Sequence, residues 1–127
     1  MKIIGKDRVP FAIEGGGHSI NLGFSSTLGV HISMKRLNTV KYYASTNSVN
    51  LGAGLIWDDV YQALQPYGVS VVGSRINGVG VAGFLLGGGY SYKSNQFGLG
   101  IDNILEYEVR NSSYFEKASH FESKIEE

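Results

Sequence analysis

Cysteine is absent from the 127 residues, and charge of neither sign is in excess. Without cysteine the chain forms no disulfide, no thiolate zinc site and no cysteine nucleophile. Lysine plus arginine equals aspartate plus glutamate, 11 against 11, so the sequence lacks the basic footprint of nucleic-acid-binding proteins and has no acidic tail. No apolar run approaches the roughly 20 residues that span a membrane. These absences predict a chain with no nucleic-acid partner and no membrane partner.

Other signals of location and metal binding are missing as well. The first residues lack the apolar stretch of a signal peptide, so we expect a soluble chain whose localisation the sequence leaves unknown. The three histidines, His18, His31 and His120, lie far apart in the sequence, and we predict no metal site. The length is that of one ordinary domain.

Glycine is the residue in excess. Its 18 occurrences are about twice the ~7% of average usage, yet 43% of the chain is hydrophobic, unlike a disordered linker. Each glycine in a folded domain costs backbone entropy. The glycines therefore indicate places where the backbone must turn sharply or approach another group closely.

Short apolar runs between the glycine clusters predict several strands and one helix. A stripe of Trp57, Val60, Tyr61 and Leu64 at helical spacing predicts a helix that ends near Pro66 and Gly68. Strands are predicted over residues 10–13, 30–34, 40–43, 48–51, 69–72 and 105–109.

The segment after Arg110 has a different composition, because the glycines stop and charge rises. Apolar residues at helical spacing predict an amphipathic helix there, through Tyr114, Ala118, Phe121 and Ile125. We therefore divide the chain into residues 1–110 and a tail over residues 111–127.

The first glycine cluster directly follows the strand at Phe11 and reads Gly15-Gly16-Gly17-His18-Ser19. Bare backbone N–H groups after a strand form a concavity that binds anions, phosphate above all. A P-loop requires Gly-Lys-Ser/Thr, which this run lacks. The alternative is a sharp turn between packed strands. A side chain at Gly16 is expected to block the approach of a phosphate.

A second cluster, Gly78-Val79-Gly80-Val81-Ala82-Gly83, matches the Gly-x-Gly-x-x-Gly fingerprint of dinucleotide-binding βαβ units. That fingerprint requires a long helix, whereas Gly87-Gly88-Gly89 follow after three residues and are unfavourable inside a helix. Asp102 stands where the ribose-binding acid of such a unit belongs, but we expect it to fix the loop between Gly98 and Ile104. Two glycine loops gripping one extended dinucleotide cofactor is the interpretation we favour.

Together these segments resemble the berberine-bridge-enzyme-like flavin oxidases, relatives of 6-hydroxynicotine oxidase. The resemblance joins the first glycine run to the stretch from Val79 to Ser91, and adds Trp57 to Tyr61 and Gly98 to Ile104. It covers about residues 3–110.

The resemblance implies an α+β fold, the para-cresol methylhydroxylase type of FAD-binding domain, here truncated at both ends. FAD would be the cofactor, held by Gly15, Gly16, Gly17, His18, Ser19, Gly78, Val79, Gly80 and Gly83. Backbone N–H groups from Gly78 to Gly83 would lie along the cofactor, and His18 would bond covalently to the flavin. The reaction implied is oxidation of an alcohol or amine carbon of a small-molecule substrate, with dioxygen as acceptor.

Three positions depart from the family pattern. Glu14 stands where the family usually has arginine or lysine, and a carboxylate repels a pyrophosphate unless it points away. Ile76 stands where some relatives attach flavin through cysteine, so at most one covalent link can form. Phe84 replaces a residue that is often polar and can only pack.

The substrate domain, with the family's catalytic base, has no counterpart in the sequence, so we expect a fragment with no catalytic residue of its own. Three interpretations remain open: part of an FAD-dependent oxidase, a non-catalytic flavin or nucleotide binder, and a truncated product without activity.

Overall fold

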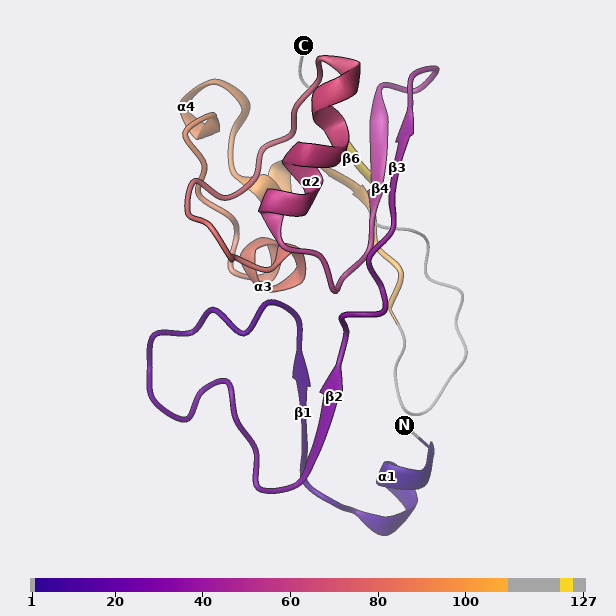
Figure 1. Cartoon of the computed structure of the whole chain (residues 1–127), viewed down its shortest axis with the longest axis vertical. Helices are drawn as coiled ribbons and strands as arrows, with labels where there is room; N and C mark the ends of the chain where they lie inside the picture. The colour runs from indigo at the N-terminus through magenta and orange to yellow at the C-terminus, as the bar shows by residue number, and fades with distance from the viewer. Residues whose placement is uncertain (1, 110–121, 125–127) are drawn as a thin grey trace.

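The computed structural model describes residues 2–109 and 122–124, which form two unequal lobes (Figure 1). The smaller lobe contains α1 (Lys2–Asp7), β1 (Phe11–Glu14) and β2 (Val30–Ser33). The larger lobe contains β3 (Val40–Tyr43), β4 (Ser48–Leu51), α2 (Trp57–Leu64), η1 (Gln65–Tyr67), α3 (Val81–Leu86), α4 (Ser94–Phe97), η2 (Gly100–Asn103), β5 (Ile104–Glu106) and β6 (Glu122–Lys124).

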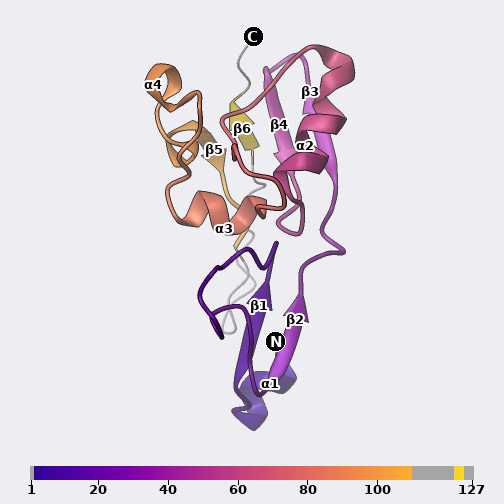
Figure 2. The ribbon, with the colours of Figure 1, turned by 60° about the vertical axis from the view of Figure 1, so that its left-hand side comes forward.

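The strands form two separate sheets. β1 and β2 pair in parallel, with Ala12 opposite His31 and Glu14 opposite Ser33. The larger sheet is antiparallel and has the order β3-β4-β6-β5. Residues 15–29 connect the two parallel strands (Figure 2). The first glycine cluster, at the start of this connection, lies where the two lobes meet.

Helix α2 supplies much of the core of the larger lobe. Its buried face carries Trp57, Val60 and Leu64, part of the predicted stripe. They form one cluster with buried side chains of β4, α3 and the connecting loops, namely Val49, Leu51, Leu55, Val71, Val81 and Leu85. Burying one such side chain stabilises a fold by roughly 1.5–3 kcal/mol. The core therefore holds α2 and α3 on the sheet.

The predicted strands over 40–43 and 48–51 are confirmed residue for residue, and the predicted helix is confirmed as α2, which carries all four residues of the stripe. The strands predicted over 10–13 and 30–34 are confirmed to within one residue at each end. The helix gives way to η1, with Pro66 in its first turn, and Gly68 closes it in the left-handed conformation at φ 68°.

Three predicted elements differ from the structure. Residues 69–72 form no strand: Val71 and Val72 are buried in a loop instead. The strand predicted over 105–109 is β5, which begins at Ile104 and ends at Glu106. Most of the helix predicted after Arg110 lies outside the described residues, but Glu122–Lys124 is a strand, so the helix is wrong there.

Candidate functional site

The two glycine loops meet at Gly16 and Gly80. A Cβ atom added at Gly16 would lie 2.5 Å from the backbone nitrogen of Gly80, closer than any side chain can approach. On its other side, Gly80 is held by an isolated antiparallel bridge to Ile56. Glycine at these positions therefore lets the smaller lobe touch the larger one backbone to backbone.

A hollow of about 390 Å³ opens beside this contact, lined by both loops. Eight of the nine predicted cofactor-binding residues line it: Gly15, Gly16, Gly17, His18, Ser19, Val79, Gly80 and Gly83. The ninth, Gly78, does not. The remaining lining residues come from β1, β2, α3 and the loop after the glycine run: Ala12, Ile13, Glu14, Phe24, Ser25, His31 and Phe84.

The backbone of the first loop is free to bind a ligand. Within the described part of the chain, no N–H group of residues 15–20 donates a hydrogen bond to the protein. Buried or half-buried N–H groups normally find a partner. A row of bare donors along a hollow suits the oxygens of a phosphate, and in this respect the residues fit FAD.

The second loop contributes fewer donors than the sequence suggests. The N–H of Gly78 donates to Asp58 Oδ2 at 2.8 Å, and the N–H of Val81 donates to Leu55 O at 2.9 Å. The expectation that the whole stretch from Gly78 to Gly83 presents its N–H groups to a cofactor is wrong at these two positions. The open space is at Gly83 on α3, where a Cβ atom would meet nothing within 4 Å.

His18 is exposed and lies at the second loop. A Cβ atom at Gly78 would lie 3.7 Å from Cδ2 of its ring. The imidazole therefore stands at the mouth of the hollow, between the two glycine clusters.

Glu14 faces the hollow and does not point away from it. Its Oε2 contacts His31 Nε2 at 2.5 Å, and its side chain also lies beside Gly17. The position of His31 at this site could not be predicted from the sequence pattern. Parallel pairing of β1 with β2 brings it there, because it places His31 opposite Ala12, diagonally across from Glu14.

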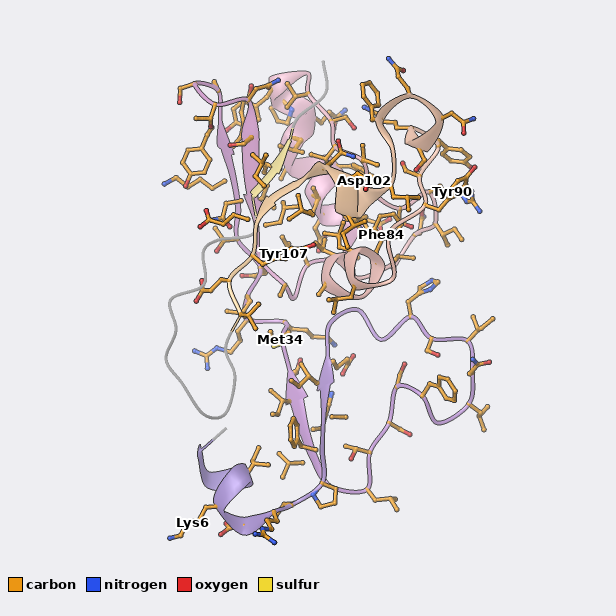
Figure 3. All side chains as sticks on the ribbon, turned by 180° about the vertical axis from the view of Figure 1, so that it is seen from behind. Lys6, Met34, Phe84, Tyr90, Asp102 and Tyr107 are labelled. Carbon is orange, nitrogen blue, oxygen red and sulfur yellow. The ribbon has the colours of Figure 1, made fainter. Side chains whose placement is uncertain are left out.

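Phe84 and Asp102 have the structural roles that the sequence predicts, Phe84 in packing and Asp102 in fixing a loop. Phe84, which is labelled in Figure 3, lies on α3. It packs edge-on against Trp57, with ring centroids 5.2 Å apart, and lines the hollow. Asp102 Oδ2 accepts the N–H of Leu99 at 2.8 Å and so fixes the loop between Gly98 and Ile104.

A second hollow, of about 370 Å³, lies by the loop over residues 73–78. Asp58, Tyr61, Arg75, Ile76 and Lys93 are among its lining residues. Burial, and secondarily the Asp58 carboxylate, raises the pKa of Tyr61 to about 12. Ile76, at the position of the family's cysteine, is 55% exposed here and does not line the first hollow.

Two absences hold for the residues that the structure describes. They contain no group of three or more His, Cys, Asp or Glu side chains able to hold a metal ion. None of their helices is long and apolar enough to cross a membrane.

Comparison with known proteins places these features in a family. A family model described as an FAD binding domain matches residues 1–113. An FAD-dependent monooxygenase, drtC of Aspergillus calidoustus, is 45% identical over 101 residues, which are 79% of this chain and 19% of that protein. The chain thus spans about a fifth of the length of this relative.

Solved flavoproteins share the fold. The 6-hydroxy-D-nicotine oxidase of Arthrobacter nicotinovorans superposes with a TM-score of 0.84 at 19% identity, covering 97% of this chain and 32% of the oxidase. The glucooligosaccharide oxidase of Acremonium strictum, which carries 6-S-cysteinyl, 8α-N1-histidyl FAD, gives 0.78 at 20% identity, with 94% and 30% covered. These findings confirm the predicted resemblance and the α+β fold of the para-cresol methylhydroxylase type.

Proposed function

The chain belongs to the FAD-binding-domain family of flavoprotein oxidoreductases, and on this basis we propose that it holds the pyrophosphate of FAD on the loop from Gly15 to Ser19. The observation that carries the proposal is the row of bare N–H groups over residues 15–20 beside a hollow of about 390 Å³. Backbone donors bind phosphate without a basic side chain. None of the lining residues of this hollow is lysine or arginine.

The second loop forms the other wall of the proposed site. Val79, Gly80 and Gly83 line the hollow opposite the first loop, and Gly83 leaves space on α3. Phe84 and Val79 add apolar surface for a flat ring. Gly78 belongs to the site indirectly, because its N–H donates to Asp58 and a Cβ atom built on it would lie 3.7 Å from His18 Cδ2.

His18 is the proposed attachment point of the flavin in the longer protein from which such a domain comes. Its ring lies at the mouth of the hollow and is exposed. A neutral imidazole nitrogen is a nucleophile near neutral pH. A bond from this nitrogen to the 8α carbon would replace one N–H and one C–H bond, and the two protons and two electrons released would pass through the flavin to dioxygen. The His-linked FAD of the Acremonium strictum oxidase, which has the same fold, supports this assignment. With Ile76 at the other position, the link is single.

The reaction proposed for that longer protein is oxidation of an alcohol or amine carbon of a small molecule. FAD held by the two glycine loops would supply the chemistry, as acceptor of a hydride from that carbon, and dioxygen would take up the electrons to give hydrogen peroxide. The residues of this chain bind and orient the cofactor, and we place the base that takes the substrate's proton outside residues 1–127. Alone, this chain should therefore release no peroxide from alcohols, sugars or amines. Release above background would contradict that placement.

Titration with FAD, followed by quenching of flavin fluorescence, tests the binding site. Gly83→Ala and Gly83→Leu put increasing bulk at a position that lines the hollow and where a Cβ atom would meet nothing within 4 Å. Both also replace glycine inside a helix, which favours α3 by roughly 0.5–1 kcal/mol. We expect affinity to fall several-fold with alanine and at least about tenfold with leucine, as thermal stability stays equal or rises.

The matched control is Ala44→Leu, which adds apolar bulk at an exposed position of the turn between β3 and β4, outside the lining of the hollow. It should leave FAD affinity unchanged. Equal affinity in the wild type and Gly83→Leu would place FAD elsewhere and overturn the proposal.

A further inference from the structure

Helix α2 anchors the loop over residues 73–78 near both of its ends. The hydroxyl of Tyr61 donates to the carbonyl of Ser74 at 2.7 Å. Four loop residues later, Asp58 Oδ2 accepts the N–H of Gly78 at 2.8 Å. Between these anchors, Ser74 Oγ accepts the N–H of Ile76 at 3.0 Å. The backbone of the loop is therefore tied to one helix at two points and to itself at a third.

The helix is a firm support for these two anchors. Trp57, Val60 and Leu64 are at most 1% exposed. Gly73, where the loop begins, sits so close to the rings of Trp57 and Tyr61 that a Cβ atom there would overlap them. The loop and α2 thus pack as one unit, and a shift of the loop would require breaking a hydrogen bond.

Gly78, the residue that Asp58 anchors, also lies beside His18. Gly78 has a φ of 77°, a conformation that favours glycine, and its Cβ direction points to Cδ2 of His18 at 3.7 Å. No side chain separates the loop backbone from the imidazole at this point. Gly78 is therefore a neighbour of the His18 ring.

We propose that Asp58 is a positioning residue for His18, acting through the N–H of Gly78 to hold the stretch of backbone beside which the imidazole lies. The inference rests on the proposed function, since it gives His18 a place from which to bond the flavin. Attack on a cofactor requires the nucleophile in one orientation, and orientation supplies a large part of the lowering of a barrier. Asp58 touches neither cofactor nor substrate in this scheme.

Nothing else among the described residues competes for the Asp58 carboxylate. Arg75 and Lys93 line the same hollow, but neither forms an ion pair with it; the guanidinium of Arg75 lies over the rings of Tyr90 and Tyr92 instead, at 5.0 and 5.8 Å. The neighbouring Asp59 is exposed. It shares the first turn of α2 with Asp58, and so the same favourable interaction with the helix dipole. Asp59 is therefore a matched control.

Nuclear magnetic resonance of the 127-residue chain tests the proposal. We expect a nuclear Overhauser contact between the His18 ring and Gly78 in the wild type and in Asp59→Ala. In Asp58→Ala the contact should be lost, with faster hydrogen exchange at the Gly78 amide. Asp58→Asn keeps an acceptor oxygen and should restore the contact. A contact that persists in Asp58→Ala would overturn the proposal.

If Asp58→Ala does not fold, the wild type and Asp58→Asn still decide the matter. A hydrogen bond to a charged carboxylate is stronger than one to a neutral amide oxygen, so the Gly78 amide should exchange its hydrogen more slowly in the wild type than in Asp58→Asn. Equal exchange rates at Gly78 in the two proteins would show that Asp58 does not hold Gly78.

A parallel FAD titration separates this inference from the proposed function. If the chain binds no FAD but the contact between His18 and Gly78 is lost in Asp58→Ala, the proposed FAD site is wrong. The proposal that Asp58 positions His18 is then still supported. Where flavin survives acid precipitation, Asp58→Ala should lower the covalent fraction more than the total bound flavin. An equal fall in both would mean that Asp58 serves stability alone.

Discussion

Glu14 is the residue in the hollow whose charge opposes a phosphate. It lines the proposed site and contacts His31, so it stands where the sequence predicts a carboxylate to repel a pyrophosphate. A charge a few ångströms from a phosphate in a partly solvated site changes affinity by roughly 1 kcal/mol or more. The carboxylate therefore makes the loop a weaker anion site than its backbone alone would be.

Replacing Glu14 with arginine should tighten FAD binding by about five-fold or more at low salt, because repulsion becomes attraction. The gain should shrink as salt is raised from about 0.05 M to about 0.5 M, since salt screens half-exposed charges. Glu106→Arg, an equal charge change on β5, controls for net charge. Weaker binding by Glu14→Arg in the fluorescence titration would mean that Glu14 does not face the phosphates.

A side chain at Gly16 would disturb the fold before it could block a cofactor. The sequence suggests that a side chain there blocks the cofactor, but the backbone of Gly80 lies in its path first. Bulk forced into packed structure typically costs 1–3 kcal/mol. The contact between the loops is thus part of the fold as well as of the site.

At the scale of elements, Gly16→Val should lower the free energy of unfolding by about 1–3 kcal/mol, because β1 and the second loop must separate. Gly15→Ala should change it by less than about 0.5 kcal/mol, since the new Cβ lies 3.5 Å from Ala53 O and 3.9 Å from Ala82 Cβ. Urea unfolding of both variants measures the difference. Equal stability of the two would show that the loops do not touch at Gly16 and Gly80.

The link between α2 and the following loop should depend on alkaline pH through Tyr61. Its pKa is about 12 in the fold and about 10 in the unfolded chain, so the fold favours the protonated phenol. This contribution to stability is complete below pH 10 and is lost as pH rises towards 12. Tyr61→Phe should be less stable near pH 8, and its stability should fall less between pH 10 and 12.

Asp58→Asn should lower the pKa of Tyr61 in ultraviolet titration, because the carboxylate is the second cause of the rise. Asp59→Asn should leave it unchanged. Parallel stability curves for the wild type and Tyr61→Phe above pH 10 would contradict the assignment.

Several elements follow directly from sequence pattern, and others depend on tertiary context. The stripe on α2 and the short runs at β3 and β4 identify their elements because each run is bounded by turn residues and faces one core. Val71 and Val72 have the same apolar character without a strand, since a short apolar run only indicates burial. Helix α3 was missed because its six residues include Gly83 and give too little periodicity.

The glycine loops of the site were predictable, and its charges were not. Glycine runs after a strand reveal a bare backbone without an alignment. The meeting of Glu14 with His31, and the loss of the Gly78 donor to Asp58, depend on how distant segments pair. Composition and spacing carry no information on such pairings.

At the scale of the whole molecule, the loop that follows His18 is unusually apolar and exposed. Ile20, Leu22, Phe24 and Leu28 are each at least 77% exposed. Contiguous apolar surface of this kind promotes association. We expect the 127-residue chain to self-associate at micromolar concentration in light scattering.

A double variant with Leu22→Lys and Phe24→Lys should associate less. The control double variant has Gln62→Lys and Asn95→Lys, at exposed positions of α2 and α4, and its association should fall far less. If both pairs of substitutions act equally, added charge alone is the cause and the apolar loop is not the contact surface.

Mapping the backbone amides of the chain during titration with FAD, and separately with riboflavin, tests the central claim most directly. Riboflavin carries the same ring without the pyrophosphate. We predict that FAD shifts the amide signals of residues 15–19 and that riboflavin leaves them largely unchanged, because the bare N–H groups there bind the phosphates. Shifts with FAD confined to Arg75, Lys93 and the second hollow, with residues 15–19 unmoved, would contradict the account.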